Sequence, residues 1–235
     1  DLLRLFGGDS VSRIMERLGL EEDQPIEHPL LSRAVENAQK KVEAHNFDIR
    51  KQLLEYDDVM NTQREVIYQQ RREVLTEADH KETVLTMAKT VLADYLTTYC
   101  SENMPPEEWD IKALIMVLEQ TFFPPRLISR EDLVGKSREE IAQFLEEKVY
   151  ALYEEREAQV GAETMRELER VILLRVVDSK WMEHLDAMDD LREGIGLRAY
   201  GQHDPLIEYK REAYEMFQGM VARIQEDTVH YLFKM

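Results

Sequence analysis

Hydrophobic side chains recur every three or four positions along most of this chain, which is the spacing of one face of an α-helix. The longest such stretch starts at Pro29, a good first helical residue, and has no further Gly or Pro up to about Leu75. At about 1.5 Å per residue this helix would be roughly 65 Å long, so we expect a strut against which several bodies pack. Its apolar stripe comprises Val35, Ala38, Val42, Ile49, Leu53, Tyr56, Met60 and Ile67, interrupted by the polar residues His45 and Gln63.

A helical hairpin is predicted over residues 161–235. A first helix leads to a loop at 194–203, and Asp204 then supplies an N-cap and Pro205 a first residue for a second helix. Two helices of about 30 residues joined by a short loop should pack antiparallel. Residues 171–177, VILLRVV, are apolar nearly all round, which predicts burial on more than one side. The facing stripes are Leu174, Val177, Trp181, Leu185, Met188 and Leu191 on the first helix, and Leu206, Tyr209, Ala213, Met216, Met220 and Ile224 on the second.

Shorter helices are predicted between these two regions, because Pro pairs at 105–106 and 124–125 interrupt the pattern. Ser137-Arg138-Glu139-Glu140 is a capping box, which should start a helix that runs through Tyr153. Residues 1–18 also show a helical pattern, which ends at Gly19.

The fold class is therefore all-α: one very long scaffold helix packed with an antiparallel two-helix hairpin, plus a small inserted helical subdomain. We expect the boundaries at residues 1–75 for the end of an upstream connection and the long helix, 76–160 for the subdomain, and 161–235 for the hairpin region.

Composition supports this class and narrows the function. The chain has only 9 Gly and 7 Pro in 235 residues, too few for the turns of an all-β fold. Its formal net charge is −18 and none of the three predicted segments is basic, which argues against nucleic-acid binding. The single cysteine, Cys100, excludes an internal disulfide framework and fits a reducing compartment. The opening residues lie inside an amphipathic run without a signal peptide, so we expect a fragment with an upstream domain.

Two glycine motifs resemble nucleotide sites but lack the required context. Gly135-Lys136-Ser137 looks like the end of a phosphate-binding loop, yet Arg130 stands where the first glycine is needed and no strand precedes it. A turn followed by the Ser137 cap explains it. Residues 194–199, GIGLRA, match a relaxed dinucleotide pattern, but they follow a helix rather than a strand.

Metal and acid–base patterns are equally incomplete. Glu77-x-x-His80 is half of a di-iron signature, and none of the other histidines supplies the second half. We interpret His45 and His184 as partly buried helix residues or polar groups at an interface. The hairpin carries an acidic cluster of Asp186, Asp189, Asp190 and Glu193. This cluster lacks the calcium-loop pattern, and we expect it to keep one face of the hairpin exposed to solvent. We therefore predict no catalytic site and no metal site in this chain.

Several long segments resemble one known family, in the same order along the chain. Residues 45–59, HNFDIRKQLLEYDDV, resemble the scaffold-helix signature of SecA, the bacterial preprotein translocase ATPase. Residues 2–9 resemble the segment that leaves the second motor fold, and 26–43 resemble the entry to the scaffold helix. Residues 161–217 resemble the two-helix finger region. Residues 76–160 match least closely and correspond by position to the helical wing domain.

The resemblance implies a part of an ATP-driven motor. In this family the long helix contacts both motor folds and the preprotein cross-linking domain, and the finger reaches into the SecYEG channel to act on unfolded preprotein. ATP and magnesium bind between the motor folds, upstream of Asp1, and the zinc-binding tail lies beyond Met235. The fragment alone should therefore need no cofactor and should not hydrolyse ATP. The implied location is the bacterial cytoplasm and the cytoplasmic face of the inner membrane, where the parent protein contacts the anionic surface peripherally.

The same resemblance assigns site residues. The family's tip tyrosine falls on Tyr200, preceded by Ala199 where a glycine is frequent, and Arg198 is the only formal charge in the loop at 194–203. An aromatic ring with a hydroxyl can contact varied substrates, although Tyr200 packing only its own loop is an open alternative. The predicted tip contacts are Leu197, Arg198, Tyr200 and Gln202, and the predicted motor contacts are Asn46, Asp48, Arg50, Tyr56, Asp57 and Asp58.

Two other function classes stay open on the sequence. One is a non-catalytic helical adaptor that docks partner proteins, and the other is an enzyme whose site assembles from scattered residues. A phosphate-binding loop in the upstream sequence would select the motor, and its absence would favour the adaptor.

Overall fold

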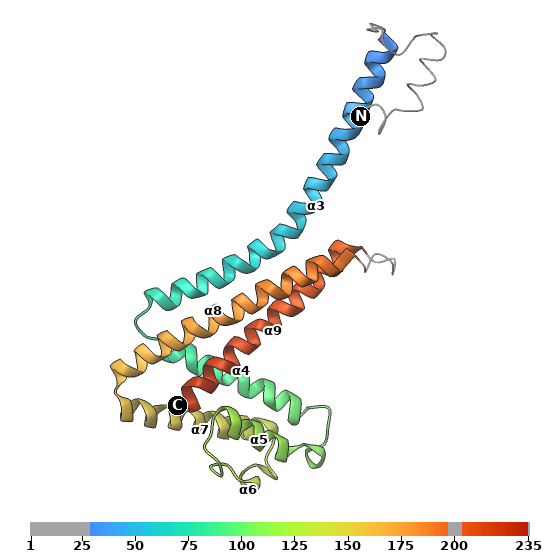
Figure 1. Cartoon of the computed structure of the whole chain (residues 1–235). Helices are drawn as coiled ribbons and strands as arrows, with labels where there is room; N and C mark the ends of the chain where they lie inside the picture. The colour runs from blue at the N-terminus through green and yellow to red at the C-terminus, as the bar shows by residue number, and fades with distance from the viewer. Residues whose placement is uncertain (1–28, 197–203, 235) are drawn as a thin grey trace. The chain divides into compact units, whose positions relative to one another are not determined.

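The computed structural model describes residues 29–196 and 204–234, and these residues form helices and no β-strand, which confirms the all-α prediction. Figure 1 shows the helices in chain order. They are α3 (Pro29–Thr76), α4 (Lys81–Tyr99), the short 3₁₀ turn η1 (Pro106–Glu108), α5 (Ile111–Thr121), α6 (Arg130–Leu133), α7 (Arg138–Val160), α8 (Ala162–Gly194) and α9 (Pro205–Lys234).

The local start and stop signals act where the sequence predicted them. α3 is a single helix of 48 residues, and α7 begins directly after the Ser137 cap. α7 is longer than predicted, because nothing in the chain beyond Tyr153 stops a helix until Gly161, which adopts a φ of 89°. The predicted helix at residues 1–18 lies outside the described residues.

The chain divides into two compact units, residues 1–60 and 61–235. In the first unit, the described part of α3 exposes large apolar side chains: Phe47, Ile49, Leu53 and Leu54 are each at least half exposed. Ile49 and Leu53 belong to the predicted apolar stripe, so these two positions of the stripe are not covered by the described residues, whereas Ala38 of the same stripe is buried. The predicted boundaries at 75/76 and 160/161 stay predictions.

In the second unit, α8 and α9 form the predicted antiparallel hairpin (Figure 1). Their inner stripes are largely buried: Val177, Trp181 and Met188 on α8 face Tyr209, Ala213, Met220 and Ile224 on α9. The run at 171–177 is buried over a broad arc, with Val171 left exposed, because α8 contacts α4 and α7 as well as α9.

The end of α9 joins the hairpin to the helices of the predicted wing segment. Lys234 Nζ donates to the Phe123 carbonyl at 2.7 Å and also to the Glu119 carbonyl, and His230 Nδ1 donates to the Gln120 carbonyl at 3.1 Å. The last carbonyls of a helix have no partner within it, so α9 caps the C-terminal end of α5.

An aromatic cluster fills the space beneath this cap. The Phe233 ring lies 5.5 Å from the Phe122 ring and 6.3 Å from the Tyr153 ring, and all three side chains are almost completely buried. This cluster therefore ties the C-terminal end of α5 to α7 and α9.

Candidate functional site

The hairpin ends in the loop that the sequence predicts to touch substrate. At its far side, Asp204 Oδ1 accepts hydrogen bonds from the backbone N–H groups of Leu206 at 2.8 Å and Ile207 at 3.4 Å, so Asp204 is the predicted N-cap of α9. The side chain of Ile195, which directly follows α8, is buried. The four predicted tip residues, Leu197, Arg198, Tyr200 and Gln202, lie outside the described residues.

A buried amide joins three helices in the hairpin region. Gln63 of α3 donates from Nε2 to the Ala213 carbonyl of α9 at 3.1 Å, and its Oε1 lies 2.8 Å from His184 Nε2 of α8. An amide oxygen can only accept, so His184 must donate this bond. Gln63 is 7% exposed, and it was visible in the sequence as a polar interruption of an apolar stripe. Sequence reasoning did not predict its partners, because they lie more than 100 positions away.

His184 is a structural group rather than a titrating one at neutral pH. Its ring lies 5.6 Å from the Trp181 ring and 5.9 Å from the Phe217 ring. Burial lowers the pKa of His184 below its ordinary value, and the Arg223 charge lowers that pKa further. A neutral imidazole with its proton on Nε2 satisfies this geometry, which confirms His184 as a buried helix residue at an interface.

The other polar residues singled out in the sequence lie in turns, at helix ends or on the surface. His80 Nδ1 lies 3.9 Å from Glu77 Oε2 in the connection between α3 and α4. The described residues hold no group of three or more His, Cys, Asp or Glu arranged for a metal ion. Gly135 has a φ of 85° in a turn, and Ser137 caps α7, as predicted. His45 is exposed, so it is not the partly buried residue that we considered.

Ion pairs hold the hairpin along its outer faces. Arg71 of α3 donates two hydrogen bonds to the Asp178 carboxylate of α8, at 2.9 and 3.3 Å. Within the hairpin, Lys180 Nζ of α8 lies 3.1 Å from Asp227 Oδ2 of α9. Arg71 and Asp178 are about half exposed, so this pair contributes little to stability, but its bidentate geometry fixes the register of α3 on α8.

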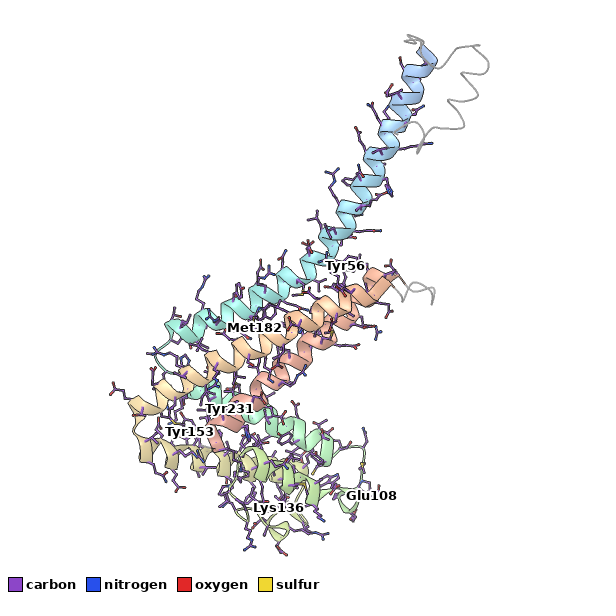
Figure 2. All side chains as sticks on the ribbon, viewed as in Figure 1. Tyr56, Glu108, Lys136, Tyr153, Met182 and Tyr231 are labelled. Carbon is purple, nitrogen blue, oxygen red and sulfur yellow. The ribbon has the colours of Figure 1, made fainter. Side chains whose placement is uncertain are left out.

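The hairpin surface is acidic with isolated apolar side chains. Met182 on α8 is 62% exposed (Figure 2), and Ile207 and Tyr214 on α9 are similarly exposed. The predicted wet face is confirmed, since its acidic residues Asp186, Asp189, Asp190 and Glu193 are all exposed. No helix in the described ranges is long and apolar enough to cross a membrane.

The predicted motor contacts all lie on α3 in the first unit. Asn46, Arg50 and Asp57 share one side of the helix by their spacing, and Arg50 Nε donates to the Asn46 carbonyl at 3.2 Å. Asp48 and Asp58 are exposed, whereas Tyr56 and Asp57 are partly buried. Whether these six residues touch a motor stays a prediction.

These features define an all-helical scaffold: a long helix, a hairpin that packs against its second half, and a group of shorter helices at the hairpin base. The sequence model of the SecA Wing and Scaffold domain matches residues 25–235, and the chain belongs to the SecA family.

Relatives agree with this assignment over the full chain. The chain is 57% identical over 234 residues to the protein translocase subunit SecA of Pelotomaculum thermopropionicum, and 54% identical over 235 residues to that of Carboxydothermus hydrogenoformans. Each match covers 100% of this chain but only 26% and 27% of the relative. The chain thus spans about a quarter of the length of these SecA subunits.

Proposed function

We propose that this chain couples the motor folds of an ATP-driven preprotein translocase to a substrate-contacting finger and regulates the ATPase. Membership in the wing and scaffold family is the observation that carries this proposal. ATP and magnesium would bind to motor folds outside this chain, and the partners would be unfolded preprotein, the SecYEG channel and the preprotein cross-linking domain. The protein would act at the cytoplasmic face of the bacterial inner membrane.

The hairpin suits the transmission of movement over a long distance. α8 has 33 residues, which makes it about 50 Å long, and its apolar stripe is buried against α9. A displacement of α3 would reach the hairpin through the Gln63 bridge and the Arg71–Asp178 pair. Because the two helices brace each other, they would move together.

The loop sequence suits contact with an unfolded chain. Tyr200 offers an aromatic face and a hydroxyl, which can contact varied side chains and peptide groups without requiring one sequence. Arg198 could bind carbonyl groups or acidic groups at the channel mouth, in a protein that is otherwise strongly acidic.

The decisive test is Tyr200→Ala in full-length SecA carrying this segment. Preprotein transport into membrane vesicles should fall, while basal ATPase persists, because the substitution removes only the substrate contact. Tyr214→Ala is the matched control, since Tyr214 is 64% exposed on the same hairpin away from the tip. Unchanged transport in Tyr200→Ala would refute the tip assignment.

A second test addresses the strut. Charge reversal at Arg50 or Asp57 should change the ratio of stimulated to basal ATPase, whereas Arg72→Glu, at an exposed α3 position in the second unit, should not. A full-length structure in which neither Arg50 nor Asp57 faces a motor fold would count against the motor contacts.

A further inference from the structure

Two joints meet at the base of the hairpin. α7 ends at Val160 and α8 begins at Ala162, so Gly161 alone connects two long helices. Its φ of 89° is one that other residues rarely adopt, and an added Cβ would meet no atom within 4 Å. Residues 77–80 form the second joint, between α3 and α4. Single-residue and short connections of this kind are where helices change their mutual angle.

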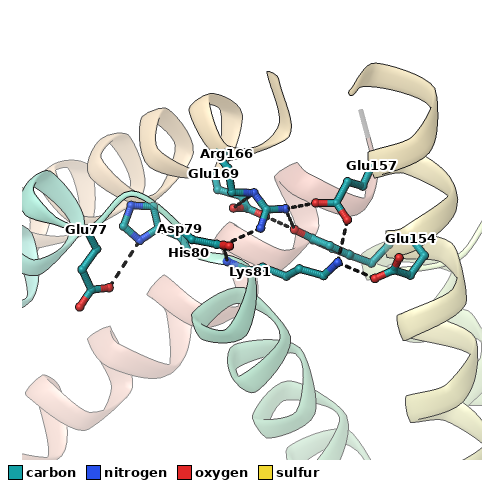
Figure 3. A network of polar contacts seen from close by, with 9 residues as sticks. Glu77, Asp79, His80, Lys81, Glu154, Glu157, Arg166 and Glu169 are labelled. Carbon is teal, nitrogen blue, oxygen red and sulfur yellow. Dashed lines mark hydrogen bonds and ion pairs between the residues drawn. The ribbon is translucent and has the colours of Figure 1, made fainter. Parts of the chain in front are cut away.

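One guanidinium bridges the segments on either side of both joints (Figure 3). Arg166, near the start of α8, donates from Nη1 to Asp79 Oδ1 in the α3–α4 connection at 2.6 Å. From Nη2 it donates to Glu157 Oε1 of α7 at 2.5 Å and to the Tyr153 hydroxyl of α7. Arg166 therefore holds α8 to the helix before Gly161 and to the connection that follows α3.

The network continues from Arg166 into the interior. Arg166 Nε lies 3.2 Å from Glu169 Oε2, and Glu169 is 0% exposed. The buried Tyr153 hydroxyl donates to Glu169 Oε1, which leaves Oε2 without a hydrogen bond. Burial raises the pKa of Glu169, and the neighbouring Arg166 charge opposes this rise by favouring the ionised carboxylate.

Negative charge exceeds positive charge in this network. The carboxylates facing it are Asp79 from the α3–α4 connection, Glu154 and Glu157 from α7, and Glu169 from α8, with Glu77 and His80 at its edge. Lys81 of α4 pairs with Glu154 at 2.5 Å and with Glu157 at 2.7 Å, so it is already shared. Without Arg166, the carboxylates of Asp79, Glu157 and Glu169, which it contacts in three segments, would face one another across the joints.

We propose that Arg166 is a positioning residue that locks the angle between the wing helices and the hairpin, so that α7 and α8 move as one body. The lock depends on the fork of the guanidinium, which reaches three segments at once, and on its charge, which cancels repulsion across Gly161. The consequence for transport rests on the proposed function, whereas the locked angle does not.

The lock can be measured as a distance in full-length SecA carrying this segment. Spin labels at the exposed positions Ala151 of α7 and Asp189 of α8 report the α7–α8 angle by pulsed electron resonance. The two labelling cysteines are introduced in a background in which Cys100 and any cysteines elsewhere in the full-length protein are replaced. The unsubstituted protein should give one narrow distribution. Arg166→Gln, which removes both the charge and the forked guanidinium, should give a broad distance distribution at about pH 7.5. Arg166→Lys should restore the narrow distribution only in part, because an ammonium group cannot form the forked pair of hydrogen bonds.

Two readouts separate this role from simple packing. In Arg166→Gln the buried Glu169 carboxylate, whose pKa is raised by burial, should take up a proton as the pH falls, so the distance distribution should narrow again at acidic pH. Glu169→Gln removes the buried charge but keeps an acceptor for the Tyr153 hydroxyl. The double variant Arg166→Gln/Glu169→Gln should therefore give a narrower distance distribution than Arg166→Gln at about pH 7.5. Arg170→Gln is the matched control, since Arg170 lies one turn further along α8, is 45% exposed and pairs with Glu167 of the same helix.

The outcomes are distinguishable. A narrow distribution in Arg166→Gln, or a broad one that neither lower pH nor Glu169→Gln narrows, overturns the proposal. If Arg166→Gln does not fold, Glu157→Ala, which removes one contact of the guanidinium, must still broaden the distance distribution or the proposal fails. Transport by Arg166→Gln should fall about fivefold or more, with basal ATPase retained. A broadened, pH-sensitive distribution with normal transport would uphold the lock and count against the proposed function.

Discussion

Replacing Gln63 with leucine tests how α3 is held to the hairpin. The substitution keeps a side chain of similar size but removes both hydrogen bonds of the amide, to His184 and to the Ala213 carbonyl. The Ala213 carbonyl is in the middle of α9 and keeps its helical hydrogen bond. The His184 N–H, in contrast, loses its partner in a site where the ring is 4% exposed.

The size of the effect follows from that asymmetry. A buried donor left without a partner costs about 1–3 kcal/mol, and the lost hydrogen bond to the carbonyl adds about 0.5–1.5 kcal/mol. The extra apolar surface of leucine offsets part of this, at about 0.8 kcal/mol per buried CH₂. We therefore expect Gln63→Leu to lower the free energy of unfolding by about 1–3 kcal/mol.

A double-mutant cycle isolates the buried bridge. His184→Phe keeps a ring between Trp181 and Phe217 but leaves the Gln63 amide oxygen without its donor. In the double variant both polar partners are gone, and replacing both by apolar groups can be nearly neutral. The double variant should therefore be more stable than the sum of the single effects predicts, with a coupling energy of about 1–2 kcal/mol.

Urea unfolding of this chain provides the assay. The free energy of unfolding is measured from helix content by circular dichroism and from Trp181 fluorescence in a Trp109→Phe background. Both probes should report the lowered stability, and Trp181 is a local probe because its ring contacts the His184 ring. Gln69→Leu is the control: Gln69 is exposed on α3 and bonds only Glu73 of its own helix in the described network, so it should change stability by about 0.5 kcal/mol or less. Strictly additive effects of Gln63→Leu and His184→Phe would refute the reasoning.

Three further substitutions test the fold at other points. Ser137→Ala removes the N-cap of α7 and should cost about 0.5–2 kcal/mol in urea unfolding. Phe233→Ala empties a site that is 1% exposed in the aromatic cluster and should cost about 3–5 kcal/mol. The Lys81 backbone N–H, and then Arg166, hold the pKa of Asp79 below its ordinary value. A lowered pKa stabilises the fold above the unfolded pKa of about 3.9, and this stabilisation is lost as the pH falls through the folded pKa. Asp79→Asn should therefore lower the melting temperature at neutral pH, and by progressively less as the pH falls below about 3.9.

Each of these substitutions has a control at an exposed position. Ser179→Ala, at an exposed position within α8, should be neutral or slightly stabilising, because no cap is lost. Tyr231→Ala, which is 52% exposed beside Phe233 in the sequence, should cost far less than Phe233→Ala. Asp94, which is exposed on α4, provides the control for Asp79. If Asp94→Asn changed the melting temperature with pH as much as Asp79→Asn does, the stabilising role of the Asp79 carboxylate would be contradicted.

Much of the secondary structure was predictable because its causes are local. Pro29 and Pro205 at first helical positions, the Ser137 capping box and Gly161 act over a few residues, and each marks a helix end in the structure. The hairpin followed from two apolar stripes joined by a short loop, since two such helices bury their stripes best against each other. The family was also predictable from the sequence, because several long segments match it position by position and in the same order along the chain.

The site was only partly readable from sequence. The tip residues around Tyr200 and the motor contacts on α3 came from resemblance alone, and they stay predictions. What the tertiary structure decided is which polar groups meet: Gln63 with His184, and Arg166 with Asp79, Glu157 and Glu169. Those partners lie on different helices, and no periodicity or spacing specifies which faces of two helices will touch. Burial then makes these contacts energetically important, because a polar group removed from water must find its partner in the folded chain.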